Sequence, residues 1–119
     1  MRGFFYILRC SDGSYYVGST TDLDARAATH MAGEGGDYTA RRLPVEVVYT
    51  EEFETLYEAF LVERQVKGWS RAKKEALIRG DYEALPPLAA NALKRAERRA
   101  LRQAQDEDAP SGPKTDRKS

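Results

Sequence analysis

The stretch GFFYILRCSDGSYYVGST, residues 3 to 20, decides the fold, because it holds two strand-forming runs on either side of a tight turn. Residues 3 to 10 and residues 15 to 20 are rich in aromatic and β-branched side chains, which fit a pleated sheet. The SDGS segment between them contains residue types that favour turns. The sequence therefore predicts a β-hairpin.

The turn allows two registers of this hairpin, and they differ in where two tyrosines lie. A two-residue loop would pair Cys10 with Tyr15. Tyr6 and Tyr16 would then lie on opposite faces of the sheet. A three-residue loop, with its glycine in the left-handed conformation of a bulge, would pair Cys10 with Ser14 and place both tyrosines on one face.

Gly18 gives the second register a functional interpretation. It would lie opposite Tyr6, and the absence of a side chain there would leave space for the backbone of a ligand. The tyrosines also have a purely structural interpretation, because aromatic side chains are common in half-buried sheets.

A short helix is predicted over residues 22 to 32. Thr21 or Asp22 can cap its start, and a glycine-rich segment ends it. Arg26 and His30 follow Leu23 at i+3 and i+7, so they belong to the stripe that this helix is expected to bury. The helix is therefore expected to direct an arginine and the only histidine of the chain toward the sheet.

Two interpretations of Arg26 follow from that placement, since a partly buried guanidinium needs an anionic partner. Asp22, four residues earlier, could form an ordinary i,i+4 ion pair. Alternatively, Arg26 could hold a phosphate in its planar fork, while His30 accepts or donates a proton nearby. The second interpretation requires a further chemical group.

Caps and periodicity predict the remaining elements. VEVVYTEEF predicts a third strand, over residues 45 to 50. Thr55 and Glu58 form a capping box that opens a helix, and Ser70 can cap another. The helices predicted in this part of the chain cover residues 55 to 67, 70 to 79 and 88 to 105.

Glu63 interrupts the face that the helix from residue 55 is expected to bury. That face follows the helical spacing and consists of Leu56, Ala59, Phe60, Glu63, Val66 and Lys67. An ion pair with Lys67 or Arg26 would account for the acid structurally. The alternative is a ligand for a hard divalent cation, because Mg²⁺ is held by one or two carboxylates together with water and substrate phosphates.

Composition excludes several classes of protein. The 19 basic and 19 acidic residues balance, so any basic surface that binds nucleic acid must be local. A single cysteine allows neither an internal disulfide nor a cysteine zinc cluster. The apolar runs are too short for a membrane span or a signal-peptide core, so a cytoplasmic protein is expected.

The chain length suits one main domain, which we place at residues 1 to 85. The consecutive prolines at positions 86 and 87 mark its end. A basic helical extension is expected over residues 86 to 105, and a disordered tail over residues 106 to 119.

Taken together, these motifs resemble those of the GIY-YIG nuclease family. FYI at residues 5 to 7 and YVG at residues 16 to 18 stand where the two family triplets belong. Arg26, His30 and Glu63 follow in the family's order and at similar spacing. The chain looks most like the small stand-alone bacterial members, relatives of the nuclease module in the bacterial excision-repair endonuclease.

The resemblance covers residues 2 to 80 and has three departures. Phe5 replaces the glycine of the first triplet, and Asp37 stands where many relatives carry a basic residue. The asparagine that some members carry after the metal glutamate has no clear counterpart, because Asn91 lies beyond the two prolines. The resemblance implies an α+β fold with a small three-stranded antiparallel sheet flanked by helices, to which the C-terminal helix is added. It favours the three-residue hairpin loop.

The resemblance also implies a metal-dependent endonuclease that hydrolyses phosphodiester bonds of DNA, with RNA as an open second substrate, in DNA repair or processing. Tyr6 would be the general base, with Tyr16 and His30 supporting it. Arg26 would bind the phosphate, and Glu63 would hold Mg²⁺ or Mn²⁺. Because a free tyrosine has a pKa of about 10, Tyr6 would need nearby cations and hydrogen bonds to act as a base.

Basic residues around Trp69 are candidates for contacts to the nucleic-acid backbone, with a solvated surface and a core tryptophan as the alternative. The candidate nucleic-acid contacts are Gly18, Tyr38, Lys67, Arg71, Lys73 and Lys74. The alternative function is a noncatalytic nucleic-acid binding or adaptor domain on the same fold. No membrane partner is expected.

Overall fold

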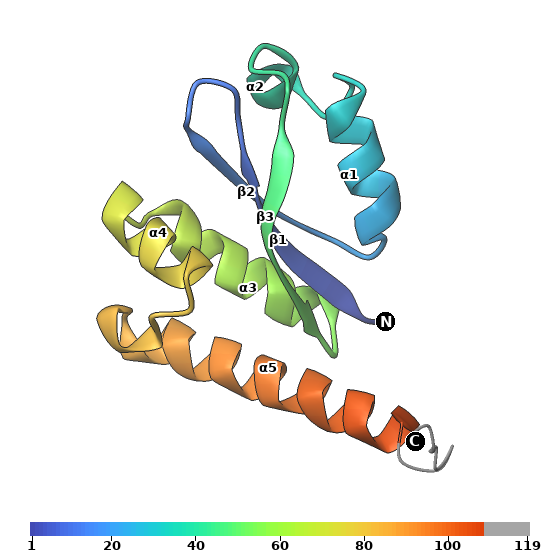
Figure 1. The fold of residues 1–119 in the computed structure, drawn as a ribbon, viewed down its shortest axis with the longest axis vertical. Helices are drawn as coiled ribbons and strands as arrows, with labels where there is room; N and C mark the ends of the chain where they lie inside the picture. The colour runs from blue at the N-terminus through green and yellow to red at the C-terminus, as the bar shows by residue number, and fades with distance from the viewer. Residues whose placement is uncertain (109–119) are drawn as a thin grey trace.

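The computed structural model describes residues 1–108, which contain a three-stranded antiparallel sheet in the order β2-β1-β3. Its strands are β1 (Gly3–Arg9), β2 (Tyr15–Thr20) and β3 (Glu46–Phe53). Figure 1 shows helices on both sides of this sheet. The predicted α+β fold class is therefore confirmed.

The hairpin has the register of the three-residue loop. Tyr6 pairs with Gly18 across β1 and β2. The Cys10 amide donates a hydrogen bond to the Ser14 carbonyl at 2.8 Å. Gly13 has a φ of 84°, a left-handed conformation that glycine adopts at little cost. Both tyrosines of the predicted pair consequently share one face of the sheet.

One face of the sheet is covered by α1 (Leu23–Met31) and α2 (Asp37–Ala40). Asp22 caps α1, since its carboxylate accepts a hydrogen bond from the Ala25 amide at 3.1 Å. The second helix lies in a segment for which no helix or strand was predicted. A helix of four residues is too short to show a periodic pattern, so the sequence did not indicate it.

The opposite face is covered by α3 (Leu56–Lys67) and α4 (Arg71–Ile78), with η1 (Tyr82–Ala84) behind them. The predicted capping box of α3 is present: the Glu58 amide donates to the Thr55 hydroxyl at 3.1 Å, and the Thr55 amide donates to the Glu58 carboxylate at 3.3 Å. The capping box fixes where α3 begins, and α3 packs against β1 and β2 of the hairpin.

Two groups of buried side chains fill the two faces of the sheet. The larger group includes Phe5, Ile7 and Val17 together with residues of α3, α4 and α5. The smaller group consists of Tyr6, Leu8, Cys10 and Val45. Because neighbouring strand residues point to opposite faces, Phe5 supplies the larger group while Tyr6 faces α1. The departure from glycine at position 5 therefore serves packing.

The C-terminal helix α5 (Pro87–Asp108) is the helix expected after the two prolines. Its Ala90, Leu93 and Ala96 lie in the same buried group as Phe5, so this helix packs against the main core. The helix also runs past its expected end at residue 105. The rest of the expected tail, residues 109–119, lies outside the described residues.

Within residues 1–108, no helix combines the length and apolar character needed to cross a bilayer.

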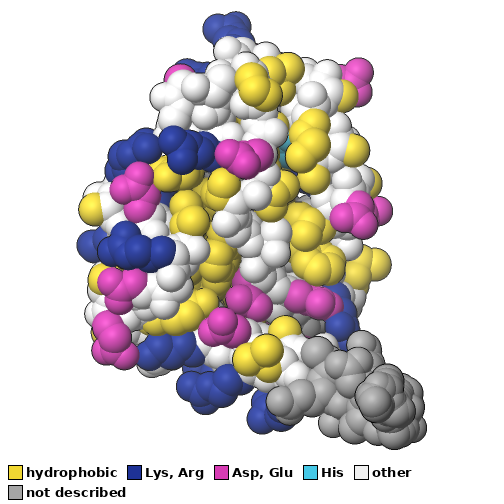
Figure 2. Space-filling model, in the orientation of Figure 1, with side chains coloured by type: hydrophobic (Ala, Val, Ile, Leu, Met, Phe, Trp, Pro, Cys, Tyr) yellow, Lys and Arg dark blue, Asp and Glu magenta, His cyan; other side chains and the backbone are white. Residues whose placement is uncertain are grey.

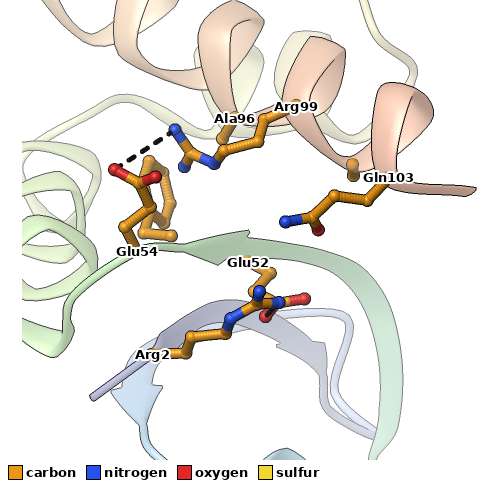
Figure 3. A pocket seen from close by; sticks show the side chains of 8 residues that line it. Arg2, Glu52, Glu54, Ala96, Arg99 and Gln103 are labelled. Atoms are coloured by element: carbon orange, nitrogen blue, oxygen red, sulfur yellow. Dashed lines mark hydrogen bonds and ion pairs between the residues drawn. The ribbon is translucent and has the colours of Figure 1, made fainter. Parts of the chain in front are cut away.

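One ion pair helps to join α5 to the end of β3. Figure 3 shows Arg99 reaching from α5 toward Glu54, and the two charged groups are 3.9 Å apart. Arg2 pairs with Glu52 at 2.6 Å on the other side of a small cavity. That cavity measures about 10 Å³, which is room for about one water molecule. The cavity is therefore too small to be a ligand site. The residues around it serve the packing of α5.

The third strand extends to Phe53, beyond its expected end at residue 50. Its added length carries Glu51 into the sheet beside Phe5. The Tyr49 hydroxyl donates to the Glu51 carboxylate at 3.3 Å and lies 3.2 Å from the Tyr82 hydroxyl. Burial raises the pKa of Glu51 to about 7, and the nearby Glu97 acts in the same direction.

Replacing Glu51 with Gln is expected to stabilise the protein at pH 8 and to have less effect at pH 5. The ordinary pKa of the carboxyl is 4.5 and the folded value is about 7, so the folded state holds this proton more tightly than the unfolded state. Stability is therefore lost as pH rises through this window. Thermal unfolding of wild type and Glu51→Gln at both pH values measures the effect.

Glu46→Gln is the matched control, because Glu46 is exposed on the same strand. A change in Tm that is equal at both pH values would contradict a raised pKa at Glu51.

Candidate active site

Tyr6 lies on the central strand, and its side chain crosses over the edge strand β2. The residue is only 1% exposed. A Cβ at Gly18 would collide with the Tyr6 hydroxyl and ring. The space above Gly18 is therefore occupied by Tyr6, which corrects the expectation that a ligand backbone enters there. Gly18 contributes to the site by allowing the phenol to lie across β2.

His30 is bound through both of its ring nitrogens. Its Nε2 lies 3.1 Å from the Tyr6 hydroxyl, and its Nδ1 lies 2.8 Å from the Thr39 hydroxyl. His30 and Thr39 are each 1% exposed. A Cβ at Gly35 would collide with the imidazole. The ring of His30 is thus held between the two hydroxyls, against the backbone of residue 35.

Tyr16 completes the aromatic surroundings of His30. The two ring centroids are 5.1 Å apart. Tyr38 lies 5.9 Å from Tyr16, and the Arg42 guanidinium lies 3.8 Å from the centroid of the Tyr38 ring. Because Tyr38 is 39% exposed, it forms the border between the buried site and the surface.

Arg26 is exposed, which corrects the prediction of a partly buried guanidinium. The buried residue of α1 is His30, so the inward face of this short helix is narrower than the sequence spacing indicated. The Asp22 carboxylate caps the helix, and within residues 1–108 Arg26 forms no ion pair. Arg26 nevertheless lies close enough to Tyr6 and His30 to act on their pKa values.

The surroundings shift the pKa values of Tyr6 and His30 in opposite directions. Burial raises the pKa of Tyr6 above its ordinary value of 10.0; the Arg26 guanidinium opposes this effect, and Tyr16 and Glu63 add to it. Burial lowers the pKa of His30 below its ordinary value of 6.5, and Arg26 acts in the same direction. At neutral pH a protonated Tyr6 therefore faces a neutral His30.

Glu63 approaches β2 from the other side of the sheet. The Ser19 hydroxyl donates to Glu63 Oε1 at 2.6 Å, and Lys67 Nζ lies 3.0 Å from Glu63 Oε2. The side chain of Glu63 is 13% exposed. Because neighbouring strand residues point to opposite faces, Gly18 meets Tyr6 on one side while Ser19 meets Glu63 on the other. The phenol and the acid therefore lie on opposite sides of the edge strand, with Glu63 close enough to act on the pKa of Tyr6.

The buried face of α3 differs from the predicted stripe. Ala59 is buried as predicted, but Val62 is buried where Phe60 was expected. Leu56 and Phe60 are exposed. Glu63 therefore lies at the margin of the buried face, and its predicted ion pair with Lys67 is present.

Glu63 fits a divalent cation only in combination with a substrate. Within residues 1–108, no group of three or more His, Cys, Asp or Glu side chains could hold a metal ion. A lone carboxylate can hold Mg²⁺ or Mn²⁺ when water and phosphate oxygens complete the coordination. The residues present are compatible with such an ion.

The basic residues around α4 include one that supports the fold and two that, within residues 1–108, form no ion pair. Figure 2 shows Lys and Arg side chains gathered over α4, with acidic side chains between them. Arg71 supports the fold, because it donates to the Gly13 carbonyl at 2.7 Å and pairs with Glu75 at 3.1 Å. In the described part of the chain, Lys73 and Lys74 form no ion pair.

Trp69 packs against the larger buried group, which agrees with its structural interpretation.

Three residues of the site were not predicted from the sequence, namely Thr39, Gly35 and Ser19. The available signal was that a buried histidine needs a partner for each ring nitrogen, but nothing local identified that partner.

Residues 2–76 match the model of the GIY-YIG catalytic domain. That range includes the two tyrosines, Arg26, His30 and Glu63 of the predicted site. The chain therefore belongs to the GIY-YIG family, whose domain defines a nuclease superfamily.

Within this family the chain is similar to UPF0213 proteins of archaea and bacteria. A UPF0213 protein of Halobacterium salinarum is 50% identical over 73 residues, which span 61% of this chain and 95% of that protein. The UPF0213 protein YazA of Bacillus subtilis is 43% identical over 93 residues, spanning 76% and 94% of the two chains. The solution structure of UPF0213 protein BH0048 from Bacillus halodurans is 45% identical, with a TM-score of 0.46 over 70% of this chain and 92% of that chain.

Proposed function

We propose that this protein is a cytoplasmic, metal-dependent nuclease that hydrolyses phosphodiester bonds of DNA in repair or processing. The observation that carries this proposal is the 3.1 Å contact between the Tyr6 hydroxyl and His30 Nε2, with Arg26 and Glu63 close by. Membership of a nuclease superfamily supports the reaction class. The free, buried thiol of Cys10 agrees with a reducing compartment.

The pair of Tyr6 and His30 offers a route for the proton of the attacking water. Tyr6 need not ionise beforehand, which its raised pKa would disfavour. Its oxygen takes a proton from water while its own proton moves to His30 Nε2. His30 has a lowered pKa, so it is neutral and ready to accept this proton at pH 7. The resulting hydroxide attacks phosphorus, and the ester oxygen leaves with its bonding electrons.

The exposure of Arg26 suits a residue that binds a phosphate arriving from solvent. A guanidinium can donate two parallel hydrogen bonds to phosphate oxygens and stabilise their charge in the transition state. A cation at Glu63 would supply further stabilisation of that charge. Tyr38, Lys73 and Lys74 are the surface residues that we assign to contacts along the nucleic acid.

A noncatalytic nucleic-acid binding domain is the second candidate function. One observation favours it: Lys67 already neutralises the carboxylate of Glu63 at 3.0 Å. That ion pair is an i,i+4 pair open to solvent on the lysine side, and such helix pairs stabilise by only about 0.3 to 0.5 kcal/mol. A divalent cation with phosphate ligands can displace so weak a partner, so we favour the nuclease.

Arg26→Ala is expected to slow cleavage of a labelled DNA substrate in Mg²⁺ or Mn²⁺ by about 100-fold or more, because removing one donor to the developing charge has effects of that size. Single-turnover rates and DNA affinity, measured together, test this expectation. The control is Arg98→Ala, a change at an exposed residue of α5. Equal rates for Arg26→Ala and wild type would exclude the phosphate-binding role.

A further inference from the structure

Thr39 is the buried residue of the four-residue helix α2, and its hydroxyl contacts His30 Nδ1 at 2.8 Å. We infer that Thr39 is a positioning residue that holds His30 in the tautomer with its proton on Nδ1, which leaves Nε2 able to accept the Tyr6 proton. This inference rests on the proposed nuclease function for its catalytic consequence. The tautomer itself is independent of that function.

Two hydrogen-bond arrangements fit the distances around His30. A neutral imidazole has one donor nitrogen and one acceptor nitrogen. In the first arrangement, Nδ1 donates to Thr39 and Tyr6 donates to Nε2. In the second, Thr39 donates to Nδ1 and Nε2 donates to the Tyr6 oxygen. Only the first lets His30 take a proton from Tyr6.

The environment of Tyr6 favours the first arrangement. The Arg26 guanidinium lies close enough to lower the pKa of Tyr6, and a guanidinium can only donate hydrogen bonds. An Nε2–H donor aimed at the Tyr6 oxygen would place a second donor beside this cation. A phenol is also a much stronger acid than the Thr39 alcohol, so it is the better donor to an imidazole nitrogen. Thr39 then accepts, using an oxygen with two lone pairs.

The local structure holds this arrangement rigidly. His30 and Thr39 are each 1% exposed, so water does not replace either partner. Gly35 allows the backbone to lie directly against the imidazole, where any side chain would collide with the ring. The ring consequently cannot turn to exchange its two nitrogens without moving the segment between α1 and α2.

The nitrogen-15 chemical shifts of the imidazole test the inference, since His30 is the only histidine in the chain. In wild type at pH 8 we expect the Nδ1-protonated tautomer to dominate. Thr39→Val removes the acceptor and leaves Nδ1–H buried without a partner. That variant should shift the tautomer population toward Nε2 protonation, whereas Thr39→Ser should retain the wild-type spectrum.

The same variants have a kinetic signature. Thr39→Val should lower kcat by about 10- to 100-fold, the size of effect known for removing a group that orients a metal-ligating histidine, with little change in KM. Thr39→Ser should restore the rate. Thr29→Val is the control, because the Thr29 hydroxyl donates to the Ala25 carbonyl on α1, away from the imidazole.

An Nε2-protonated His30 in wild type would overturn the inference, whether or not the variants fold. Unchanged tautomer populations in a folded Thr39→Val would also overturn it. If the wild-type tautomer is as expected but no DNA is cleaved, the positioning of His30 stands and the nuclease function fails.

Discussion

Replacing Tyr6 with Phe is expected to lower the single-turnover rate of DNA cleavage by at least about 100-fold, the lower bound for losing a general acid–base group. The phenyl ring can keep its place over Gly18, so the packing of the sheet should survive. What disappears is the oxygen 3.1 Å from His30 Nε2, and with it the route of the proton from water to imidazole.

The same change should also lower the free energy of unfolding. His30 Nε2 loses a buried hydrogen-bond partner, which destabilises by about 1 to 3 kcal/mol. Circular dichroism and urea unfolding separate this effect from the loss of rate. Tyr57→Phe is the control, because Tyr57 is exposed on α3. A Tyr6→Phe variant that is folded and cleaves at the wild-type rate would remove Tyr6 from the mechanism.

Replacing Glu63 with Gln is expected to reduce metal-stimulated cleavage by about 100-fold or more, since a bound cation supplies several kcal/mol of charge stabilisation in such reactions. The amide oxygen of Gln can still accept the hydrogen bond that Ser19 donates at 2.6 Å, so the local geometry is preserved. The loss of the Lys67 pair changes stability only slightly, because that pair is an i,i+4 contact with an exposed lysine.

The metal dependence gives this prediction its sharpest readout. Glu63→Gln should need a higher concentration of Mg²⁺ or Mn²⁺ to reach half of its maximal rate, while Glu46→Gln, at an exposed position of β3, should titrate like wild type. An identical metal titration for Glu63→Gln and wild type would mean that the cation binds elsewhere.

The hairpin could be predicted from sequence because its determinants are local. A glycine at position 13 can adopt the left-handed conformation, and strand residues alternate between faces. Once the three-residue loop was favoured, the shared face of Tyr6 and Tyr16 followed. The capping box of Thr55 and Glu58 was equally local, and the structure reproduces it.

The partners of His30 could not be predicted, because they depend on tertiary packing. Thr39 lies on a helix too short to leave a pattern, and it meets His30 only because the chain folds back after α1. The exposure of Arg26 depends on how little of α1 the sheet covers. The hydrophobic pattern of a nine-residue helix is too short to show which of its residues the sheet buries.

The packing of α5 against the main core could not be predicted for a similar reason. Consecutive prolines do interrupt a helix, but they do not show whether the next helix packs against the same core. Leu93 lies fully buried among residues of the sheet and α3. The alanines at positions 90 and 96 allow α5 to approach closely, and a sequence rich in arginine on its other faces masked this apolar stripe.

Cleavage of labelled single-stranded, duplex and branched DNA by the wild-type protein, with Mg²⁺ or Mn²⁺ and with the cation chelated, tests the central claim most directly. The arrangement of Tyr6, His30, Arg26 and Glu63 predicts metal-dependent cleavage of at least one of these substrates, lost on chelation. Measurable DNA binding without cleavage of any substrate, in either cation, would contradict the nuclease and leave a nucleic-acid binding domain.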